Sequence, residues 1–453
     1  MNCHDAEPNC LPPEDGLRRT LHNEVHARPQ ARIRMPALVL YVAVLNSDIS
    51  RAQECAHLRQ LPGQQDLQEE QLGGNFLRLR LDGYTLKWER HSEFSRYSLV
   101  QPLPDHALQG QDDAQLLASV LLPEGWLRQI PGRTLAAVQL LLLHGDLSDP
   151  ATLQAQAQAW FGEHPLVASA MGRNSHSWAV TDFRLRPSGF ERMLVLAPPD
   201  MSQTRAGRVS QRLLELETYR LMALRGLPVA KELAPMLAQA EADLADITTR
   251  LESKGADDQE LLATLVSLSA RVERATASHM YRFSATRAYQ ALVRQRIDEL
   301  RESAVPGIQT VGEFMQRRLW PAMATVAATE QRLAKLSERV ARASALLRTR
   351  VDIAAELQNQ QLLAKLTRGQ ELQLQLQTTV EGLSIAAISY YVVSLLLYGA
   401  KGLKGLGLPL NPELAVAALI PLVLGAVWAT SRRIHKRVLH ASGASLPGHS
   451  QDT

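Results

Sequence analysis

The stretch LSIAAISYYVVSLLLYGA, from Leu383 to Ala400, decides the architecture of this chain. It contains no charged side chain, and no proline interrupts the sequence that precedes it as far back as Ala322. At 1.5 Å per residue, such a helix extends about 27 Å, close to the roughly 30 Å thickness of a bilayer's hydrocarbon core. We therefore expect a membrane-spanning helix that continues directly from a long helix before it.

A second uncharged stretch, LAVAALIPLVLGAVWATS, runs from Leu414 to Ser431. Two such segments close together predict a two-helix transmembrane hairpin, and the alternative is a helical hairpin buried in a large soluble core. Two crossings return the chain to its starting side, and basic residues follow at 432–437. The positive-inside rule then places both termini in the cytoplasm. The aromatic residues available as interfacial anchors are Tyr390, Tyr391, Tyr398 and Trp428.

Residues 204–382, before the first apolar stretch, are rich in Leu, Ala, Arg, Glu and Gln, a composition typical of helices. Turn signals divide them into three long helices: about Arg205–Leu251, about Asp257–Ser303, and one that begins near Val311. The third helix carries an apolar, coiled-coil-like stripe at Leu333, Leu336, Val340, Ala343 and Leu347. Such a stripe needs a partner, either the two preceding helices or the same helix of other subunits.

Residues 33–203 have the pattern of a mixed α/β domain. MPALVLYVAVL (Met35–Leu45) suits a buried strand, and FLRLRLDGYTLKWER alternates about an Asp82-Gly83 turn, which predicts an antiparallel hairpin. The predicted fold class is therefore α+β, and the predicted segments are 1–32, 33–203, 204–382, the membrane hairpin 383–431 and a basic cytoplasmic tail 432–453.

Composition excludes several classes of protein. The chain has 453 residues, with 49 basic against 46 acidic, so its overall charge gives no case for nucleic-acid binding. Its three cysteines are too few for a disulfide framework and lack paired metal-ligand spacing. The polar, acidic N-terminus predicts no cleavable signal peptide.

LHNEVHARPQ (Leu21–Gln30) places His22 and His26 one helical turn apart, a spacing that zinc proteases use. At 100° per residue, however, Glu24 points about 200° away from both histidines, so we expect neither a catalytic role nor a metal site. The segment is interpreted as a short helix ended by the proline, and as a polar junction between the α/β domain and the helices. An anion pocket is the alternative, formed by Arg18, Arg19, His22, His26 and Arg28.

Two further groups raise catalytic or metal hypotheses. Alternation along KWERHSEF would place Glu89, His91 and Glu93 on one strand face, where the histidine could act as a general base, although a solvated sheet face is the expected structure. Glu215, Glu217 and Tyr219 could form an acidic, metal-sensing helix surface, whereas an ordinary salt-bridged helix is the simpler expectation. We predict that the protein is not an enzyme.

The chain resembles an uncharacterised bacterial family of membrane-anchored proteins over nearly its whole length. The resemblance is carried by LHNEVHARP, KWERHSEF, QRLLELETYRLMAL and QLQTTVEGLSIAAISYY. In architecture it is similar to the CorA-type divalent-cation channels, which have a cytoplasmic α/β domain, a long stalk helix that enters the membrane, and a basic tail. Their Tyr-Gly-Met-Asn signature falls on Tyr398-Gly399-Ala400-Lys401, and a Pro-Glu-Leu of their external loop on Pro412-Glu413-Leu414.

The departure at Lys401 changes the expected activity. In the CorA-type channels the corresponding Asn carbonyl receives a hydrated cation, whereas a ring of ammonium groups would repel magnesium. We therefore expect a homo-oligomeric channel or transporter with altered selectivity, in contact with the lipid bilayer and an ion. The alternative is a membrane-anchored scaffold or sensor without transport, and an enzyme that uses His26 or His91 is the third possibility. The pore-mouth candidates are Tyr398, Gly399, Lys401, Lys404 and Glu413.

Overall fold

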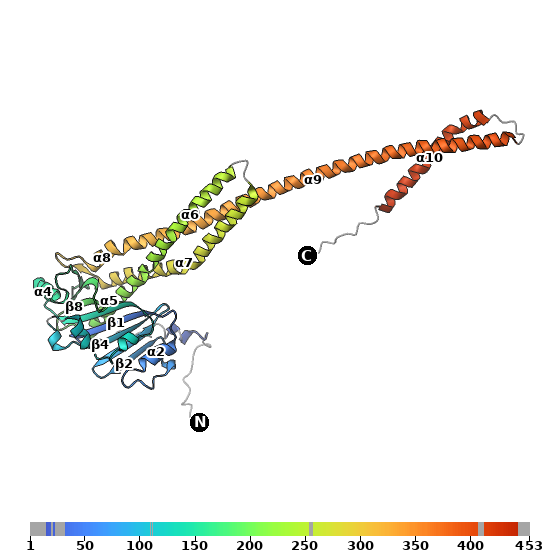
Figure 1. The fold of residues 1–453 in the computed structure, drawn as a ribbon. Coiled ribbons are helices and arrows are strands. Elements are labelled where there is room, and N and C mark those ends of the chain that lie inside the picture. Colours follow the sequence, from blue (N-terminus) through green and yellow to red (C-terminus); the bar gives the residue numbers. More distant parts are fainter. Residues whose placement is uncertain are drawn as a thin grey trace, which may run out of the picture. The chain divides into compact units, whose positions relative to one another are not determined.

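A computed structural model describes residues 15–19, 21–22, 32–108, 110, 112–252, 257–405 and 412–442 (Figure 1). It divides into two compact units, Met1–Ala345 and Leu346–Thr453, which are described separately below. Helices and strands are both present, so the mixed α and β content predicted from sequence is confirmed.

The first unit is built on one mixed sheet, which has nine strands among the described residues, in the order β2-β3-β4-β1-β5-β8-β7-β6-β9. Strands β5 and β8 pair in parallel, and the other neighbours pair antiparallel. The predicted hairpin is confirmed as β2 and β3, which join at Gly83 with a φ of 75°. The strands are β1 (Ala37–Leu45), β2 (Phe76–Leu81), β3 (Tyr84–Arg90), β4 (Phe94–Pro102), β5 (Arg133–His144), β6 (Val167–Met171), β7 (Ser177–Leu185), β8 (Glu191–Ala197) and β9 (Ser303–Ala304).

The two faces of this sheet differ in chemistry because alternate residues of a strand point to opposite sides. On β1, Leu40, Val42 and Val44 pack into an apolar cluster with α2 (Arg51–Leu58). A second apolar cluster forms against α4 (Pro150–Phe161), beside the short α3 (Asp113–Ala118). The opposite face, which carries Tyr41, is covered by α5 (Gln203–Leu224), and α5 in turn packs against α7 (Asp258–Leu300).

The predicted helix Arg205–Leu251 is broken in the structure. It divides at Arg225 into α5 and α6 (Gly226–Glu252). A Cβ at Gly226 would lie 2.4 Å from the Thr286 hydroxyl of α7, so the turn fits only a residue without a side chain. The sequence carries a local signal for this break, because Gly226 and Pro228 stand in the first turn of α6, where proline is tolerated.

The third predicted helix also begins differently. Residues from Val311 form the short α8 (Val311–Arg318), and α9 (Trp320–Gly405) starts after it with Pro321 in its first turn. Proline is tolerated there because first-turn amides have no partner within the helix. From this point α9 is one continuous helix of 86 residues.

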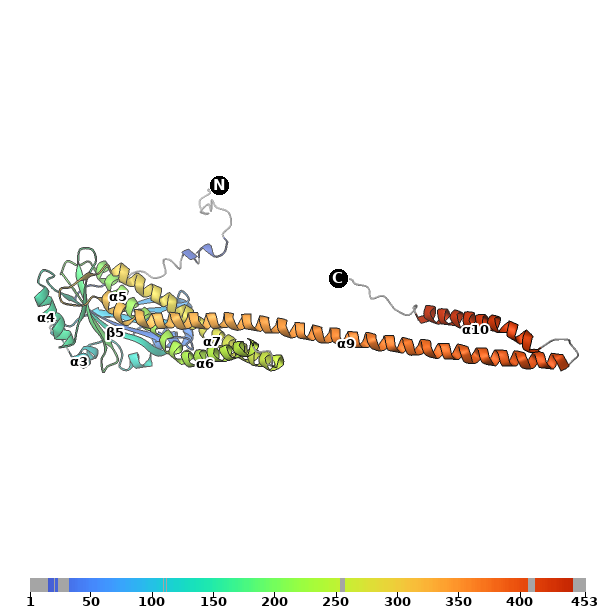
Figure 2. The ribbon, with the colours of Figure 1, turned by 90° about the horizontal axis from the view of Figure 1, so that it is seen from above.

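The apolar stripe on the first part of α9 is covered by the chain's own helices. Leu333, Leu336 and Val340 are each at most 4% exposed. Figures 1 and 2 both show α6 and α7 alongside this part of α9. Ion pairs tie the three helices together: Arg332 of α9 with Glu241 of α6, and Glu330 of α9 with Arg287 of α7. For this stripe, the two preceding helices are the partners.

The second unit contains the rest of α9 and α10 (Pro412–Ser442). Among the described residues, one helix is long and apolar enough to cross a membrane, within Val311–Gly402, and the apolar part of α10, Val416–Thr430, is shorter. Ser389 of α9 and Val416 and Val423 of α10 are buried within this unit. Most other apolar side chains of this part of α9 are exposed.

Candidate functional site

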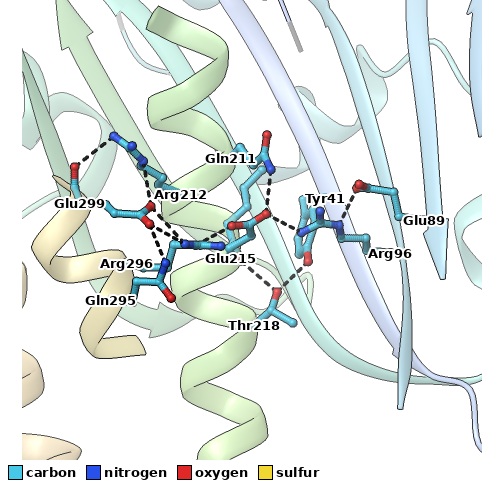
Figure 3. Close-up of polar contacts among 11 residues, drawn as sticks. Tyr41, Glu89, Arg96, Gln211, Arg212, Glu215, Thr218, Gln295, Arg296 and Glu299 are labelled. Atoms are coloured by element: carbon cyan, nitrogen blue, oxygen red, sulfur yellow. Dashed lines mark hydrogen bonds and ion pairs between the residues drawn. The ribbon is translucent and has the colours of Figure 1, made fainter. Parts of the chain in front are cut away.

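A buried ionic network lies between the sheet and α5, centred on Arg96 of β4 (Figure 3). The Nε of Arg96 donates to Glu89 of β3 at 2.5 Å, and its Nη1 donates to Glu215 of α5 at 3.2 Å. Arg96 is 3% exposed and Glu89 is fully buried. Alternation explains the placement: Arg96 points toward α5, whereas its neighbour Tyr97 joins the apolar cluster on the other side.

Glu215 connects the sheet to the second helical layer. Its other oxygen accepts a hydrogen bond of 2.6 Å from the Nε of Arg296 on α7. Arg296 also pairs with Glu299 at 3.0 Å, and Glu299 pairs with Arg212 of α5 at 3.3 Å (Figure 3). Beside Arg96, the Tyr41 hydroxyl of β1 hydrogen-bonds with that of Thr218 at 2.6 Å. The network therefore joins three layers through charged groups.

The charges of this network are fixed near neutral pH. Burial alone would raise the pKa of Glu89, but Arg96 and Lys87 outweigh it and hold the pKa at about 2. For Glu215 the same competition between burial and Arg96 lowers the pKa. Burial raises the pKa of Tyr41. These groups do not exchange protons easily, so the arrangement suits a rigid charged junction better than acid–base chemistry.

A second buried ionic group lies farther along α5, on a different side of the helix from Glu215. Arg220 pairs with Glu217, one turn before it, and with Glu191 of β8 at 3.2 Å. Burial, with the neighbouring Glu217 carboxylate adding to it, raises the pKa of Glu191 to about 8. One arginine therefore stands against two carboxyl groups, and Glu191 remains largely protonated at neutral pH.

The structure describes only some of the N-terminal residues that were predicted to form a polar junction or an anion pocket. Arg18, Arg19 and His22 are exposed, and their helical turn is started by Asp15, whose carboxylate accepts from the backbone N–H of Arg18 at 2.7 Å. His26 and Arg28 lie outside the described residues, so the predicted polar junction or anion pocket stays a prediction. Within the part of the chain that the structure describes, no group of three or more His, Cys, Asp or Glu side chains could hold a metal ion.

The histidine hypothesis for KWERHSEF is wrong in its geometry. Strand β3 ends at Arg90, so His91 and Glu93 lie in the turn to β4 and do not share a strand face with Glu89. His91 stacks on the Phe94 ring, with centroids 4.6 Å apart, and Glu93 pairs with Arg282 of α7. Glu89 is buried under α5, where the sequence predicted a solvated face, because alternation shows which residues share a face and not what covers them.

The prediction of an acidic, metal-sensing surface on α5 is also wrong. Glu215 and Glu217 are 4% and 0% exposed, and arginines neutralise both. The Tyr219 ring lies 5.9 Å from the Arg296 guanidinium. These residues form the α5 side of the buried junction and do not face solvent as a cation-sensing surface would.

The residues predicted at the membrane end lie near the end of α9 and the start of α10. Tyr398, Lys401 and Glu413 are exposed, and the Lys401 ammonium stands 6.0 Å from the Tyr398 ring centroid. Lys404 is in the last turn of α9, and its side chain lies outside the described residues, as do 406–411. The structure therefore keeps Tyr398 and Lys401 together on one helix turn.

A family model matches residues 13–438, nearly the whole chain, and its description is "Protein of unknown function (DUF3422)". The chain belongs to the DUF3422 family. No curated protein and no solved structure matches it. The membership confirms the resemblance to an uncharacterised family and brings no activity with it.

Sequence reasoning missed Arg96 and Arg296, the two cations at the centre of the DUF3422 chain's buried network. A signal for Arg96 existed: in the strand FSRYSLV it shares a face with Ser98, opposite Tyr97 and Leu99 of the apolar cluster. Arg296 ends a basic stretch that starts at Arg271 and that suits a partner of acidic helices, but no local signal pairs it with Glu215, 81 positions away in sequence.

Proposed function

We propose that the protein is a membrane-embedded homo-oligomer, with a layout like that of the CorA-type channels, that conducts ions with a different selectivity. The observation that carries the proposal is a seam of exposed residues on α9, spaced alternately by three and four positions. The seam residues are Leu362, Leu366, Gly369, Gln373, Leu376, Val380, Leu383 and Ala387.

The seam has the spacing that brings parallel helices together. Its leucines and valine are 52–67% exposed, and a continuous stripe of exposed apolar side chains is unstable alone in water. If the apolar segment that follows crosses the membrane in one direction in every copy, the seams of neighbouring copies are parallel and in register. Self-association through this seam would therefore bury the exposed stripe and keep every copy in the same orientation across the membrane.

The same spacing continues into the apolar segment through Tyr390, Ser394, Leu397 and Lys401. A straight helix drifts about 20° per heptad from such a seam, so the proposal requires a left-handed supercoil. Ser389, buried in the second unit, lies about 130° around the helix from the seam at 100° per residue. The buried flank of α9 is therefore not the seam, which leaves the seam free to line an axis between copies.

The proposed ion selectivity follows from Lys401, which continues the spacing of the seam. In an oligomer its ammonium groups would form a ring, and each would repel a divalent cation at 6 Å by roughly 1.4 kcal/mol even in the dielectric of water. Neighbouring lysines add to this repulsion. We expect magnesium to be excluded and anions to pass more easily.

The experiment measures assembly and flux on the purified full chain. Light scattering in detergent is expected to give an oligomer, and liposomes are expected to pass chloride more readily than magnesium. Lys401→Glu should reverse this preference and Lys401→Asn should weaken it. The control, Lys365→Asn, removes an exposed lysine far from the membrane end and should change neither flux.

A monomer in detergent would refute a pore between subunits. Oligomers without flux, or flux indifferent to Lys401→Glu, would favour the second candidate, a membrane-anchored scaffold or sensor. The buried ionic network supports that candidate, because it ties the sheet rigidly to α5 and α7. Under either function, we propose that α9 and α10 form a transmembrane hairpin with both termini in the cytoplasm of a bacterial inner membrane.

A further inference from the structure

A pocket of about 60 Å³ opens beside the buried ionic network, between the sheet and the start of α5. Four cationic side chains line it: Arg32, Arg78, Lys87 and Arg96. Of the described residues around the pocket, none contributes a carboxylate to its wall.

The cations of the pocket outnumber the acids that neutralise them. Lys87 pairs with Glu89 at 3.0 Å, and Arg96 shares Glu89 and Glu215. Glu215 is in turn shared with Arg296, so these two carboxylates already face three cations. Among the described residues, neither Arg32 nor Arg78 has an acidic partner. Within the described part of the chain, positive charge at the pocket therefore exceeds negative charge.

We infer that this pocket binds a small organic anion whose carboxylate or phosphate group is held between Arg78, Lys87 and Arg32. Arg78 and Lys87 are half-buried, whereas Arg32 is exposed at the rim. Counter-charges stabilise partly buried cations, and arginine forks match carboxylate and phosphate oxygens. Burial lowers the pKa of Lys87, with Glu89 opposing the shift, so a bound anion would also stabilise the charged lysine.

The rest of the pocket limits the ligand's size and shape. Ile33, Val39, Val100 and Leu214 form an apolar part of the wall, beside the hydroxyls of Thr85 and Ser98. A cavity needs roughly 10–15 Å³ to hold one water molecule, so this pocket of about 60 Å³ has room for about four to six waters. A charged head group with a body of a few carbon atoms fits this space, and a nucleotide does not.

The test uses the purified full chain in detergent and three probes: inorganic phosphate, acetate and butyrate. At equal ionic strength set with chloride, at least one probe is expected to raise the melting temperature and to show saturable binding by calorimetry. Phosphate binding without carboxylate binding would identify a phosphate-bearing ligand, and the reverse would identify a carboxylate. If none of the three probes binds, the inference is wrong.

Matched variants on one strand locate the site. Arg78→Gln removes a pocket cation outside the buried network, and it should weaken binding by about tenfold or more, the usual loss for a charge-assisted hydrogen bond. Arg80 lies two positions along β2 on the same face but does not line the pocket, so Arg80→Gln should leave binding within about twofold. Equal affinities in the two variants would overturn the inference, and neither result depends on oligomerisation or flux.

Discussion

Arg96 lies under α5 with two glutamates as partners, and both distances are those of charge-assisted hydrogen bonds. Such pairs contribute little net stability compared with apolar residues of the same shape. Removing one partner is costly, however, because the other is left buried with its charge uncompensated. At the residue scale, the network therefore constrains which side chains the fold tolerates.

We expect Arg96→Met to lower the free energy of unfolding by about 3–5 kcal/mol, because Glu89 would lose its nearest counter-charge. Urea unfolding followed by tryptophan fluorescence measures the change, since buried Trp88 adjoins Glu89 on β3. The control is Arg342→Met, which breaks an exposed pair with Glu338 on α9 and should cost less than about 1 kcal/mol. Similar losses in both variants would contradict the assigned role of burial.

Because the pKa of Glu191 is raised on folding, we expect the free energy of unfolding to depend on pH. Its pKa of about 8 in the folded state exceeds the unfolded value of 4.5, so between these pH values the folded state binds more protons. The contribution of Glu191 to the free energy of unfolding is therefore fully present below pH 4.5 and is lost as the pH rises through 8.

The variant Glu191→Gln keeps a neutral side chain at all pH values and should flatten this part of the stability profile, with its largest relative gain near pH 8. Thermal melts from pH 5 to pH 9 measure it. The exposed Glu163→Gln serves as control and should leave the profile unchanged. A profile that keeps its slope in Glu191→Gln would show that another group titrates.

At the scale of elements, α9 uses different surfaces along its length. Its first part buries Leu336 and Val340 beside α6 and α7, whereas Leu376 and Val380 remain 67% and 59% exposed. The local sequence is helical throughout, so propensity does not distinguish the two parts. The difference arises because α6 and α7 accompany only the first part of the helix.

We expect Leu376→Lys to dissociate the proposed oligomer, since an ammonium group in the seam would be buried without a partner. Leu374→Lys is the matched control: this leucine is also exposed, at 63%, but it lies about 200° around the helix from Leu376. Light scattering in detergent compares the two. Equal subunit numbers in both variants would argue against the seam.

At the scale of the whole molecule, the chain divides after Ala345 into two compact units. The first unit holds the sheet, the buried ionic network and the covered stripe of α9 as far as Ala343, whereas the exposed seam and the apolar segment lie beyond it. We expect a chain of residues 1–350 to stay folded and monomeric without detergent, as measured by circular dichroism and light scattering. A fragment that aggregates or unfolds would show that the second unit is needed for the first.

Several parts of the fold could be predicted from the sequence because their causes are local. The alternation about Asp82-Gly83 predicts the β2–β3 hairpin, since strand period and turn chemistry act between neighbours. The break at Arg225 has local signals in Gly226 and Pro228, whereas the close approach of Thr286, 60 positions later in the chain than Gly226, arises only from the fold. The candidate site followed the same division: the family's sequence motifs drew attention to Glu89 and Glu215 but not to their arginine partners.

By itself, the sequence determined the α+β composition, the long uninterrupted helix and the apolar segment from Leu383 to Ala400, because periodicity and hydrophobicity are properties of consecutive residues. Only the tertiary structure decided that Glu89 is buried against Arg96 and that four cations meet around one small pocket. The free energy of a charged side chain depends on what covers it and on the charges beside it. Those neighbours come from β1, β2, β3, β4 and α5, which are distant in sequence and adjacent only after folding.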